Sequence, residues 1–514
     1  MYGVHSFSMV LPFQGNKMLK TLRLYAVLAL LPLLLSCGCG KQPEGGYTLQ
    51  DISVTPARLD MVVGDKATVK AYPKPSVANA LSLAWKTSDA AVATVSDGLV
   101  EAIGAGEAII TVSYQTVSKE IPVAVEAKPE PVPGAFSRAV MYDEKLSASN
   151  RPEAIQTAGV ATYADDGLLV NKAGGVVKLD RFYALAERAV RYRIRPTGDA
   201  VCLFRSSEGD FQATVDIPGK KITILTTPAV SATADFLAGD KEYEVEVKHV
   251  YQSQTVTVTD VASGAVAEAS ATMDGEGGCG KGKIHDGFYV GPGWDHYCFG
   301  LQKGTSMLVS RITVESLKDH VRLLICGDSI TQPEAYYPTA DFPGAYTQLL
   351  INRLGGSAMS SGRGGGNINT VMEYLPHELP YIKADYVMVT IGTNGGNTEQ
   401  NLSELIEYIK SQGSIPILNN MPANESASQC DAAFGGNPLI ARVREQKNVK
   451  GAKLDIATSL NGDGRNVDKS MMYWEDYTGY PAPMTGWQIY HHPNPKGGRA
   501  MFERIVQDLP EIFE

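Results

Sequence analysis

The stretch Leu-Leu-Ile-Cys-Gly-Asp-Ser-Ile-Thr, residues 323–331, joins a short apolar run to a polar turn. Such a run, short and rich in aliphatic residues, predicts a buried β-strand over Arg322–Cys326. The turn that follows places Ser329 just beyond the end of this strand. Similar runs predict further strands downstream, at Tyr386–Ile391, Ile415–Asn419 and Lys453–Ile456, with a weaker one at Ala358–Ser361.

Helical patterns alternate with these strands, at Gly344–Leu354, Ile368–Tyr374, Glu399–Lys410, Pro438–Gln446 and Pro495–Leu509. Alternation of buried strands with helices predicts a three-layer α/β domain around a parallel sheet, which we place at residues 319–514. Ligands of such sheets bind beyond the carboxyl ends of the strands. Ser329 occupies such a position.

The preceding part of the chain reads as two β-sandwiches. Residues 51–126 hold short alternating strands separated by turns. A Pro-rich linker follows at 127–134. A second, larger sandwich is predicted at 135–318, and lectin-like jelly rolls offer an analogy for its fold. The first sandwich resembles a bacterial Ig-like domain of group 2 at Val54-Thr-Pro56, Gly64-Asp65, Trp85, Ser88-Asp89, Val92–Val95, Gly98–Val100, Gly104, Gly106 and Ile110–Val112.

The N-terminus predicts export. A basic segment from Met18 to Arg23 precedes a short apolar core, which is too short for a membrane span. Leu34-Leu-Ser-Cys37 then resembles a bacterial lipobox, so residues 1–40 are interpreted as a lipoprotein signal peptide with Cys37 as the lipidated residue. The expected location is the cell envelope, with a lipid anchor in the outer membrane, on its periplasmic or surface face.

Charge and cysteine content narrow the function. The net charge of −10 argues against a nucleic-acid partner, which requires a basic face. The seven cysteines form no CxxC pair, so we predict no metal site and no disulfide framework.

Three further motifs follow predicted strands or precede a helix. Residues 360–367 are rich in glycine, and Gly362 there leaves its backbone N–H open to an oxyanion. Asn394, in Gly392-Thr-Asn394, offers a second donor. His491-His492-Pro-Asn494 places a histidine before the last helix, with Asn494 as the expected N-cap.

Together with Gly327-Asp-Ser329, these blocks resemble the GDSL, or SGNH, hydrolase family. The resemblance implies that Ser329 is the nucleophile and His492 the general base. It also implies an oxyanion hole built from Ser329, Gly362 and Asn394, with no metal or organic cofactor. His491 competes with His492 for the basic role, and the His-Pro-Asn register favours His492.

One departure from the family concerns the acid that orients the histidine. The family places it three residues before the histidine, where this chain has Gln488 and Ile489. Either a backbone carbonyl holds the imidazole in a Ser–His dyad, or a nearby acid replaces the missing one. Asp468, Glu475 and Asp476 are candidates that the sequence does not rank, and Asp476 is the one we assign.

The predicted function is a serine esterase that removes O-acetyl groups from a polysaccharide through an acyl-enzyme. An exported, lipid-anchored chain with an Ig-like spacer and an adjoining sandwich favours a glycan substrate, and Trp474, Trp487 and Tyr490 offer rings on which a sugar stacks. The alternatives are a general acyl esterase or lipase acting on small esters, and a surface glycan-binding lipoprotein whose hydrolase domain has decayed.

Overall fold

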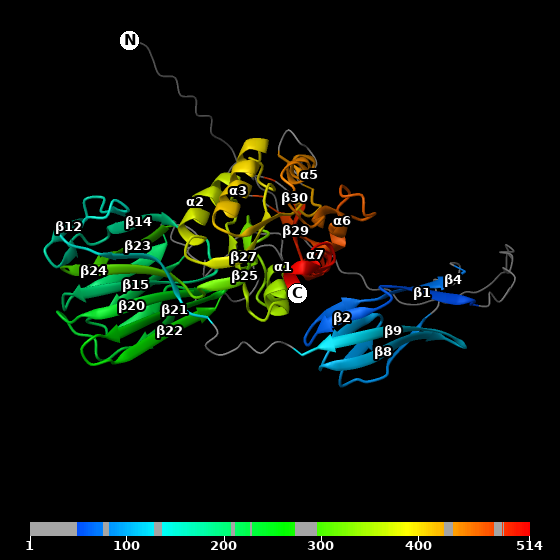
Figure 1. Ribbon diagram of the computed structural model, residues 1–514. Coiled ribbons are helices and arrows are strands. Elements are labelled where there is room, and N and C mark those ends of the chain that lie inside the picture. Colours follow the sequence, from blue (N-terminus) through cyan, green and yellow to red (C-terminus); the bar gives the residue numbers. More distant parts are fainter. Residues whose placement is uncertain are drawn as a thin grey trace, which may run out of the picture.

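The computed structural model describes residues 49–75, 82–127, 136–206, 211–226, 229–272, 296–425, 435–476, 478, 486 and 488–514. The signal peptide with Cys37, nearly all of the predicted linker, and Trp487 lie outside these residues. Three bodies of secondary structure follow one another along the chain (Figure 1).

The first body is the Ig-like sandwich. Its two larger sheets have the strand orders β2-β9-β8-β5 and β3-β7-β6, and β1 pairs with β4. Buried and exposed residues alternate along β8, so one face of this strand enters the core and the other meets solvent. The strands are β1 (Asp51–Thr55), β2 (Leu59–Val62), β3 (Lys66–Thr68), β4 (Lys70–Lys74), β5 (Ala84–Thr87), β6 (Ala93–Ser96), β7 (Leu99–Ala102), β8 (Gly106–Tyr114) and β9 (Val117–Glu126).

The second body is a larger antiparallel sandwich with one eight-stranded and one seven-stranded sheet. Tyr192 of one sheet meets Phe204 of the other, with ring centroids 4.9 Å apart, so aromatic residues fill the space between the sheets. Its strands are β10 (Ala139–Lys145), β11 (Ile155–Gln156), β12 (Ala161–Ala164), β13 (Gly167–Val170), β14 (Val176–Phe182), β15 (Glu187–Pro196), β16 (Val201–Ser206), β17 (Gln212–Asp216), β18 (Lys221–Ile224), β19 (Val230–Thr233), β20 (Tyr243–Val250), β21 (Ser253–Asp260), β22 (Val266–Thr272), β23 (His296–Lys303) and β24 (Met307–Ser316).

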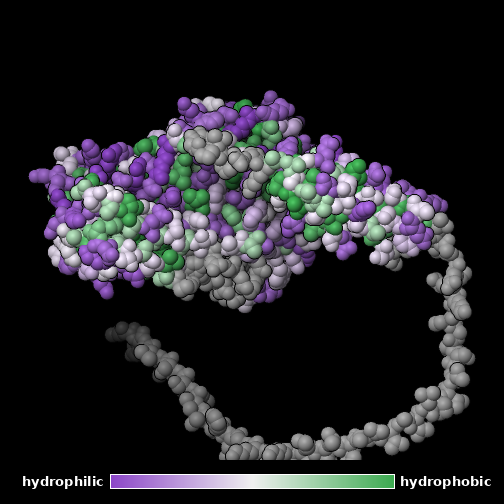
Figure 2. Space-filling view, turned by 90° about the horizontal axis from the view of Figure 1, so that it is seen from below, coloured by the Kyte–Doolittle hydropathy of each residue, from purple (hydrophilic) through white to green (hydrophobic). Residues whose placement is uncertain are grey.

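The outer faces of both sandwiches are mixed in character. Every second residue of β20 is buried and the residues between are partly exposed, and these include Glu244, Glu246 and Lys248. Figure 2 shows hydrophilic and apolar groups interspersed over one face of the molecule. In the part of the chain that the structure describes, none of the helices combines the length and apolarity that a membrane crossing needs.

The third body is built on a parallel sheet with the order β26-β25-β27-β28. Its strands are β25 (His320–Gly327), β26 (Ala358–Gly362), β27 (Lys383–Thr390) and β28 (Ile415–Leu418). Its helices are α1 (Tyr346–Arg353), α2 (Ile368–Glu378), α3 (Glu399–Ser411), α5 (Asn437–Gln446), α6 (Leu454–Thr458) and α7 (Pro495–Asp508), with short 3-10 turns η3 (Pro333–Ala335), η4 (Phe342–Gly344), η6 (Lys469–Met471) and η7 (Pro510–Phe513).

Helices cover both faces of the sheet, which gives three layers. Leu323 and Ile325 of β25 pack in one core with α1 and α7, whereas Leu324 and Cys326 pack in another with α2, α3 and α5. This alternation is the consequence of a strand buried on both faces. It explains why residues 323–326 of β25 form an uninterrupted apolar run.

One predicted strand is wrong. Residues 453–456 were expected to extend the sheet, but Leu454–Thr458 form the helix α6. The chain pairs with β28 three residues earlier, at a parallel bridge between Ile417 and Lys450, and the Leu418 N–H donates to the Lys450 carbonyl at 2.9 Å. Thr458 Oγ1 donates to the Leu454 carbonyl at 3.0 Å, which closes the helical turn.

The larger sandwich is joined to the edge of the parallel sheet. Leu185 forms an antiparallel bridge with Ser361 of β26, and the Ala186 N–H donates to the Ser360 carbonyl at 2.9 Å. The buried carboxylate of Glu378, in α2, accepts hydrogen bonds from the backbone N–H groups of Ala184 at 2.5 Å and Leu185 at 3.0 Å. The sandwich therefore extends the sheet that carries the glycine-rich block.

Candidate active site

A tight turn after β25 presents Ser329. The Asp328 side chain accepts from the Ile330 N–H at 3.0 Å, and the Asp328 carbonyl accepts from the N–H groups of Thr331 and Gln332, each at 3.0 Å. Burial raises the pKa of Asp328 to about 6, because the charged carboxylate loses its hydration. Asp328 thus stabilises the turn and leaves Ser329 at the carboxyl edge of the sheet.

His492 reaches the same edge on a two-stranded ribbon, β29 (Met472–Asp476) and β30 (Gln488–Pro493). Trp474 pairs with Tyr490 and Met472 pairs with Pro493, so one residue of β29 faces two of β30. This is a β-bulge, which bends the strand and re-aims side chains. The two residues in the bulge are His491 and His492, and both are buried.

The bulge brings three side chains into line. His492 Nε2 lies 2.7 Å from Ser329 Oγ, and His492 Nδ1 lies 2.6 Å from Glu475 Oε1. The same Glu475 oxygen accepts from the His492 backbone N–H at 2.9 Å. Ser329 is 4% exposed, His492 is 2% exposed and Glu475 is 0% exposed. Water is therefore largely excluded from this row of three side chains. The geometry is that of a serine, a general base and an orienting carboxylate.

The acid on His492 is therefore Glu475, and our assignment of Asp476 was wrong. Successive residues of a strand face opposite sides, so Asp476 faces away from the histidine when Glu475 faces it. Asp476 instead accepts hydrogen bonds from the Thr478 N–H at 2.9 Å and from the Gln488 side chain at 3.3 Å. Asp468 caps η6, accepting from the Ser470 N–H at 3.0 Å.

Tyr336 stacks on the imidazole of His492. The ring centroids are 4.6 Å apart and the ring planes differ by 14°. Tyr336 follows η3, within the stretch that carries Ser329, and a Cβ on Gly364 would collide with its hydroxyl. The glycine-rich block therefore makes room for this ring. Sequence reasoning gave Tyr336 no role, because no spacing rule connects it to residue 492.

His491 lies beside the row of three without joining it. Its ring centroid is 4.4 Å from that of His492, and its Nδ1 is 3.8 Å from Glu475 Oε2. Burial lowers its pKa to about 4, because the imidazolium would lose hydration and would face His492. His491 is thus a buried, neutral imidazole, and His492 is the histidine that contacts Ser329.

The two other predicted site residues lie at the ends of the strands on either side of β25. Gly362 ends β26, and a Cβ there would lie 2.8 Å from the Gln332 backbone nitrogen, so the strand can approach the turn only as glycine. Asn394 follows β27, and its side-chain N–H donates to the Gly366 carbonyl at 2.8 Å. Asn494 caps α7 as expected, accepting from the N–H groups of Lys496 and Gly497 at 3.0 and 3.1 Å.

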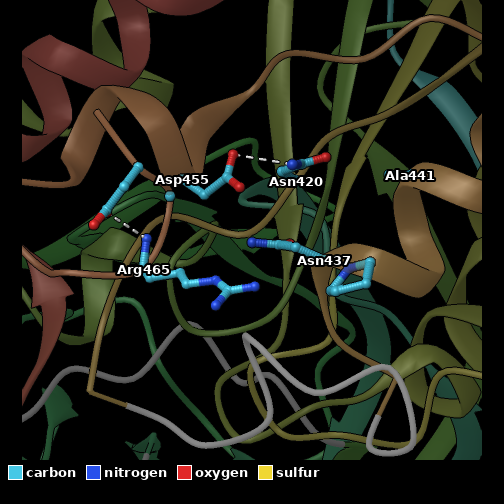
Figure 3. A pocket seen from close by; sticks show the side chains of 8 residues that line it. Asn420, Asn437, Ala441, Asp455 and Arg465 are labelled. Carbon is cyan, nitrogen blue, oxygen red and sulfur yellow. Dashed lines mark hydrogen bonds between the residues drawn. The ribbon is translucent and has the colours of Figure 1, made fainter. Parts of the chain in front are cut away.

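A small polar cavity of about 220 Å³ opens beyond β28 (Figure 3). Its lining includes Asn420, Asn437, Asp455 and Arg465, and the Asn420 side chain donates to Asp455 at 2.9 Å. Ser329 is not among the residues that line it. The cavity was not anticipated, since its members come from four separate segments.

Comparisons with known proteins identify the first of these domains. The profile of the bacterial Ig-like domain (group 2) matches residues 49–125. No curated protein matches the chain. The chain has an N-terminal Ig-like domain and is a multidomain protein, mostly β, with a parallel sheet in its C-terminal part.

Solved structures match parts of the chain at low identity. LAE5, an alpha/beta hydrolase from the metagenome of Lake Arreo, is 18% identical, covers 36% of this chain and 93% of its own, and has a TM-score of 0.28. A predicted lipolytic protein of the G-D-S-L family from Desulfitobacterium hafniense is 16% identical, and the match covers 37% of this chain and 99% of that protein, with a TM-score of 0.26. The exoplasmic domain of VIP36 is 10% identical, covers 35% and 90%, and scores 0.26.

Proposed function

We propose that the protein is a serine esterase that removes O-acetyl groups from a glycan. The observation that carries this proposal is the row Glu475–His492–Ser329, joined by contacts of 2.6 and 2.7 Å. The position of Glu475 beside His492 also supports an active enzyme over a decayed hydrolase, because an orienting acid is present.

The chemistry follows from the row. His492 Nε2 takes the Ser329 proton while Ser329 Oγ attacks the ester carbonyl carbon. Glu475 holds the Nδ1 proton of the imidazole and stabilises the imidazolium that forms, without itself taking the proton. His492 then gives its Nε2 proton to the leaving alcohol. A water molecule, deprotonated by His492, cleaves the acyl-enzyme and restores Ser329.

The oxyanion that develops on the carbonyl oxygen needs hydrogen-bond donors. We assign the backbone N–H groups of Ser329 and Gly362 and the side-chain amide of Asn394 to this role. The Asn394 amide has two N–H groups, and one donates to the Gly366 carbonyl, which orients the other. The loss of one such donor costs about 2.7–4 kcal/mol in the barrier.

A glycan substrate is supported by the ribbon that carries the site. Trp474 is 42% exposed, and its ring centroid is 5.0 Å from that of Tyr490. Both residues flank the catalytic row in sequence, Trp474 before Glu475 and Tyr490 before the two histidines. An exposed ring such as that of Trp474, packed on a partly buried Tyr490, is a surface on which the apolar face of a sugar ring stacks. A lipid anchor at Cys37 would hold the enzyme at the cell envelope beside polymeric substrates.

The test compares the full chain with Ser329→Ala. Hydrolysis of 4-nitrophenyl acetate, and release of acetate from acetylated xylan and pectin, should be lost in the variant while its circular dichroism spectrum is unchanged. Turnover of 4-nitrophenyl acetate without release from any polymer would favour the alternative of a general esterase for small esters. Absence of all turnover would contradict the proposal and leave glycan binding.

Trp474→Ala should affect the polymeric substrate and leave 4-nitrophenyl acetate unaffected. If the Trp474–Tyr490 pair stacks on sugars, the KM for the preferred polymer rises, and the kinetics with 4-nitrophenyl acetate stay the same. Stacking on an aromatic ring is worth about 0.5–1.5 kcal/mol, so the rise should be about 2- to 12-fold. An equal change for both substrates would instead indicate a disturbed ribbon.

A further inference from the structure

Among the residues that the structure describes, the buried histidine beside the row of three has no partner that accounts for its burial. His491 is 8% exposed, and neither of its ring nitrogens has a hydrogen-bond partner among the described residues. Polar groups in a protein interior are almost always satisfied, so one that is not deserves an explanation. Its nearest charged neighbour is Glu475, whose Oε2 lies 3.8 Å from His491 Nδ1.

Glu475, His491 and His492 together form a ligand set. Each offers one ligand atom, and the three atoms lie within 4.8 Å of one another. Two imidazole nitrogens and one carboxylate oxygen are ligands that Zn²⁺ takes, with a fourth position left for water. The β-bulge creates this set, because it turns two consecutive histidines toward one carboxylate.

We propose that Glu475, His491 and His492 form an inhibitory site for a divalent transition metal such as Zn²⁺. The metal takes His491 Nδ1, His492 Nδ1 and a carboxylate oxygen of Glu475. Because a coordinating nitrogen must be free of its proton, binding releases the His492 Nδ1 proton to solvent.

Metal binding and catalysis exclude each other at this site. In the row of three, His492 Nδ1 and Glu475 Oε1 are 2.6 Å apart, with a proton between them. Tetrahedral Zn²⁺, with bonds of about 2.0–2.1 Å, holds its ligand atoms about 3.3 Å apart. The His492 ring must therefore move away from Glu475, and its 2.7 Å contact with Ser329 changes with it. Binding itself does not depend on the proposed function, whereas inhibition rests on it.

Binding is measured first on Ser329→Ala, which cannot turn over. Titration of the metal-free full chain with Co²⁺, followed by the visible absorption of tetrahedral Co²⁺, and with Zn²⁺ by calorimetry, should show one site. His491→Asn should weaken binding at least tenfold, since even the outer partners of metal ligands change affinity by about 10–100-fold. His320→Asn is the matched control, because this histidine is exposed beside Asp385, and it should bind as the parent does.

Inhibition is measured on the enzyme with Ser329 intact. Zn²⁺ should abolish hydrolysis of 4-nitrophenyl acetate, and a chelator should restore it. In His491→Asn the inhibiting Zn²⁺ concentration, relative to the variant's own metal-free rate, should rise at least tenfold, in line with its weakened binding. His491→Gln is the second variant if the first fails to fold.

The outcomes separate the two proposals. Absence of a bound metal in Ser329→Ala, or equal affinity after both His491 substitutions, would overturn the metal site whether or not the enzyme is active. Binding at the site without any esterase activity would sustain the metal site and contradict the proposed function. Inhibition by Zn²⁺ that is unchanged in the His491 variants would place the inhibiting metal elsewhere and overturn the inhibitory role.

Discussion

Glu475 Oε1 accepts two hydrogen bonds from His492, one from its backbone N–H at 2.9 Å and one from Nδ1 at 2.6 Å. The first fixes the position of the strand and the second fixes the tautomer and tilt of the ring. One carboxylate oxygen therefore places the basic nitrogen of His492 toward Ser329. The acid comes from the neighbouring strand of the ribbon, and not from the position three residues before the histidine, which is Ile489 in this chain.

Replacing Glu475 should reveal this role. Glu475→Gln keeps the shape of the side chain but removes its charge, so kcat for 4-nitrophenyl acetate should fall by up to about 10⁴-fold. Asp476→Asn is the matched control, because that side chain turns away from His492, and its kcat should stay near that of the parent. Equal losses in both variants would argue that the ribbon, and not the carboxylate, had been disturbed.

The register of the ribbon explains why the sequence could predict Ser329 and His492 but not Glu475. Ser329 and His492 lie in local motifs, one after an apolar run and one before a helix cap, and local patterns are visible in a sequence. The choice between Glu475 and Asp476 depends on which face of β29 meets β30, and a shift of one residue reverses it. The bulge at His491 and His492 adds such a shift.

The same reasoning applies to the fold. The five helices predicted in the C-terminal domain are present, because their amphipathic patterns are local. The failed strand at 453–456 contains apolar residues that suit a strand or a helix equally. The pairing of Ile417 with Lys450 decided between them, and that contact spans distant parts of the chain. The Leu185–Ser361 bridge is likewise a contact between two domains, and the sequence pattern of neither domain predicts it.

Tyr336 should matter through its stack on His492. The imidazolium formed during the reaction gains from the face of an aromatic ring, by about 0.5–2 kcal/mol. Tyr336→Leu should therefore lower kcat by about 2- to 30-fold. Tyr336→Phe retains the ring and should keep most of the activity. If Tyr336→Phe lost as much activity as Tyr336→Leu, the effect would be due to the hydroxyl group and not to the ring.

Glu378 should make the stability of the protein depend on pH. Burial raises its pKa to about 7, whereas an unfolded glutamate titrates near 4.3. Between these values the folded state keeps a proton that the unfolded chain has released, so the free energy of unfolding falls as the pH rises. The stabilisation that the buried, protonated Glu378 contributes is fully present below about pH 4.3 and is lost as the pH rises through 7.

Glu378→Gln mimics the protonated side chain and keeps an acceptor for the N–H groups of Ala184 and Leu185. Urea titrations give the free energy of unfolding at about pH 5 and pH 8. The free energy of unfolding of the variant, relative to that of the parent, should increase between these pH values by at most on the order of 3 kcal/mol. Glu373→Gln, on the exposed side of the same helix, is the control and should follow the parent. A constant difference between Glu378→Gln and the parent would contradict the raised pKa.

Gly362 should not tolerate a side chain. A Cβ would lie 2.8 Å from the Gln332 backbone nitrogen and 2.8 Å from the Thr331 carbonyl carbon, both in the turn that presents Ser329. Gly362→Ala should cost about 1–3 kcal/mol of stability, which overpacking typically costs, and should lower kcat because the turn must move. Gly198→Ala, whose Cβ would meet its nearest neighbour at 3.8 Å, should change neither quantity.

The larger sandwich should be needed for the parallel-sheet domain to fold. One hydrophobic core runs through both, including Leu185 from the sandwich and Leu324 from the sheet. The Gln252 side chain of the sandwich also donates to the Tyr337 carbonyl at 3.1 Å, just after the residue that stacks on His492. A chain of residues 319–514 would expose this core and leave the buried Glu378 carboxylate without two of its donors, and it should aggregate.

The Ig-like domain offers the matched deletion. Its ion pairs with the parallel-sheet domain, Asp65 with Arg499 and Glu126 with Arg353, involve partly exposed side chains, and such pairs contribute about 0–1 kcal/mol each. Residues 136–514 should therefore remain soluble, with the kcat and melting temperature of the full chain. Size-exclusion chromatography and hydrolysis of 4-nitrophenyl acetate distinguish the two truncations. A monomeric and fully active 319–514 would show that the shared core does not set the fold of the active site.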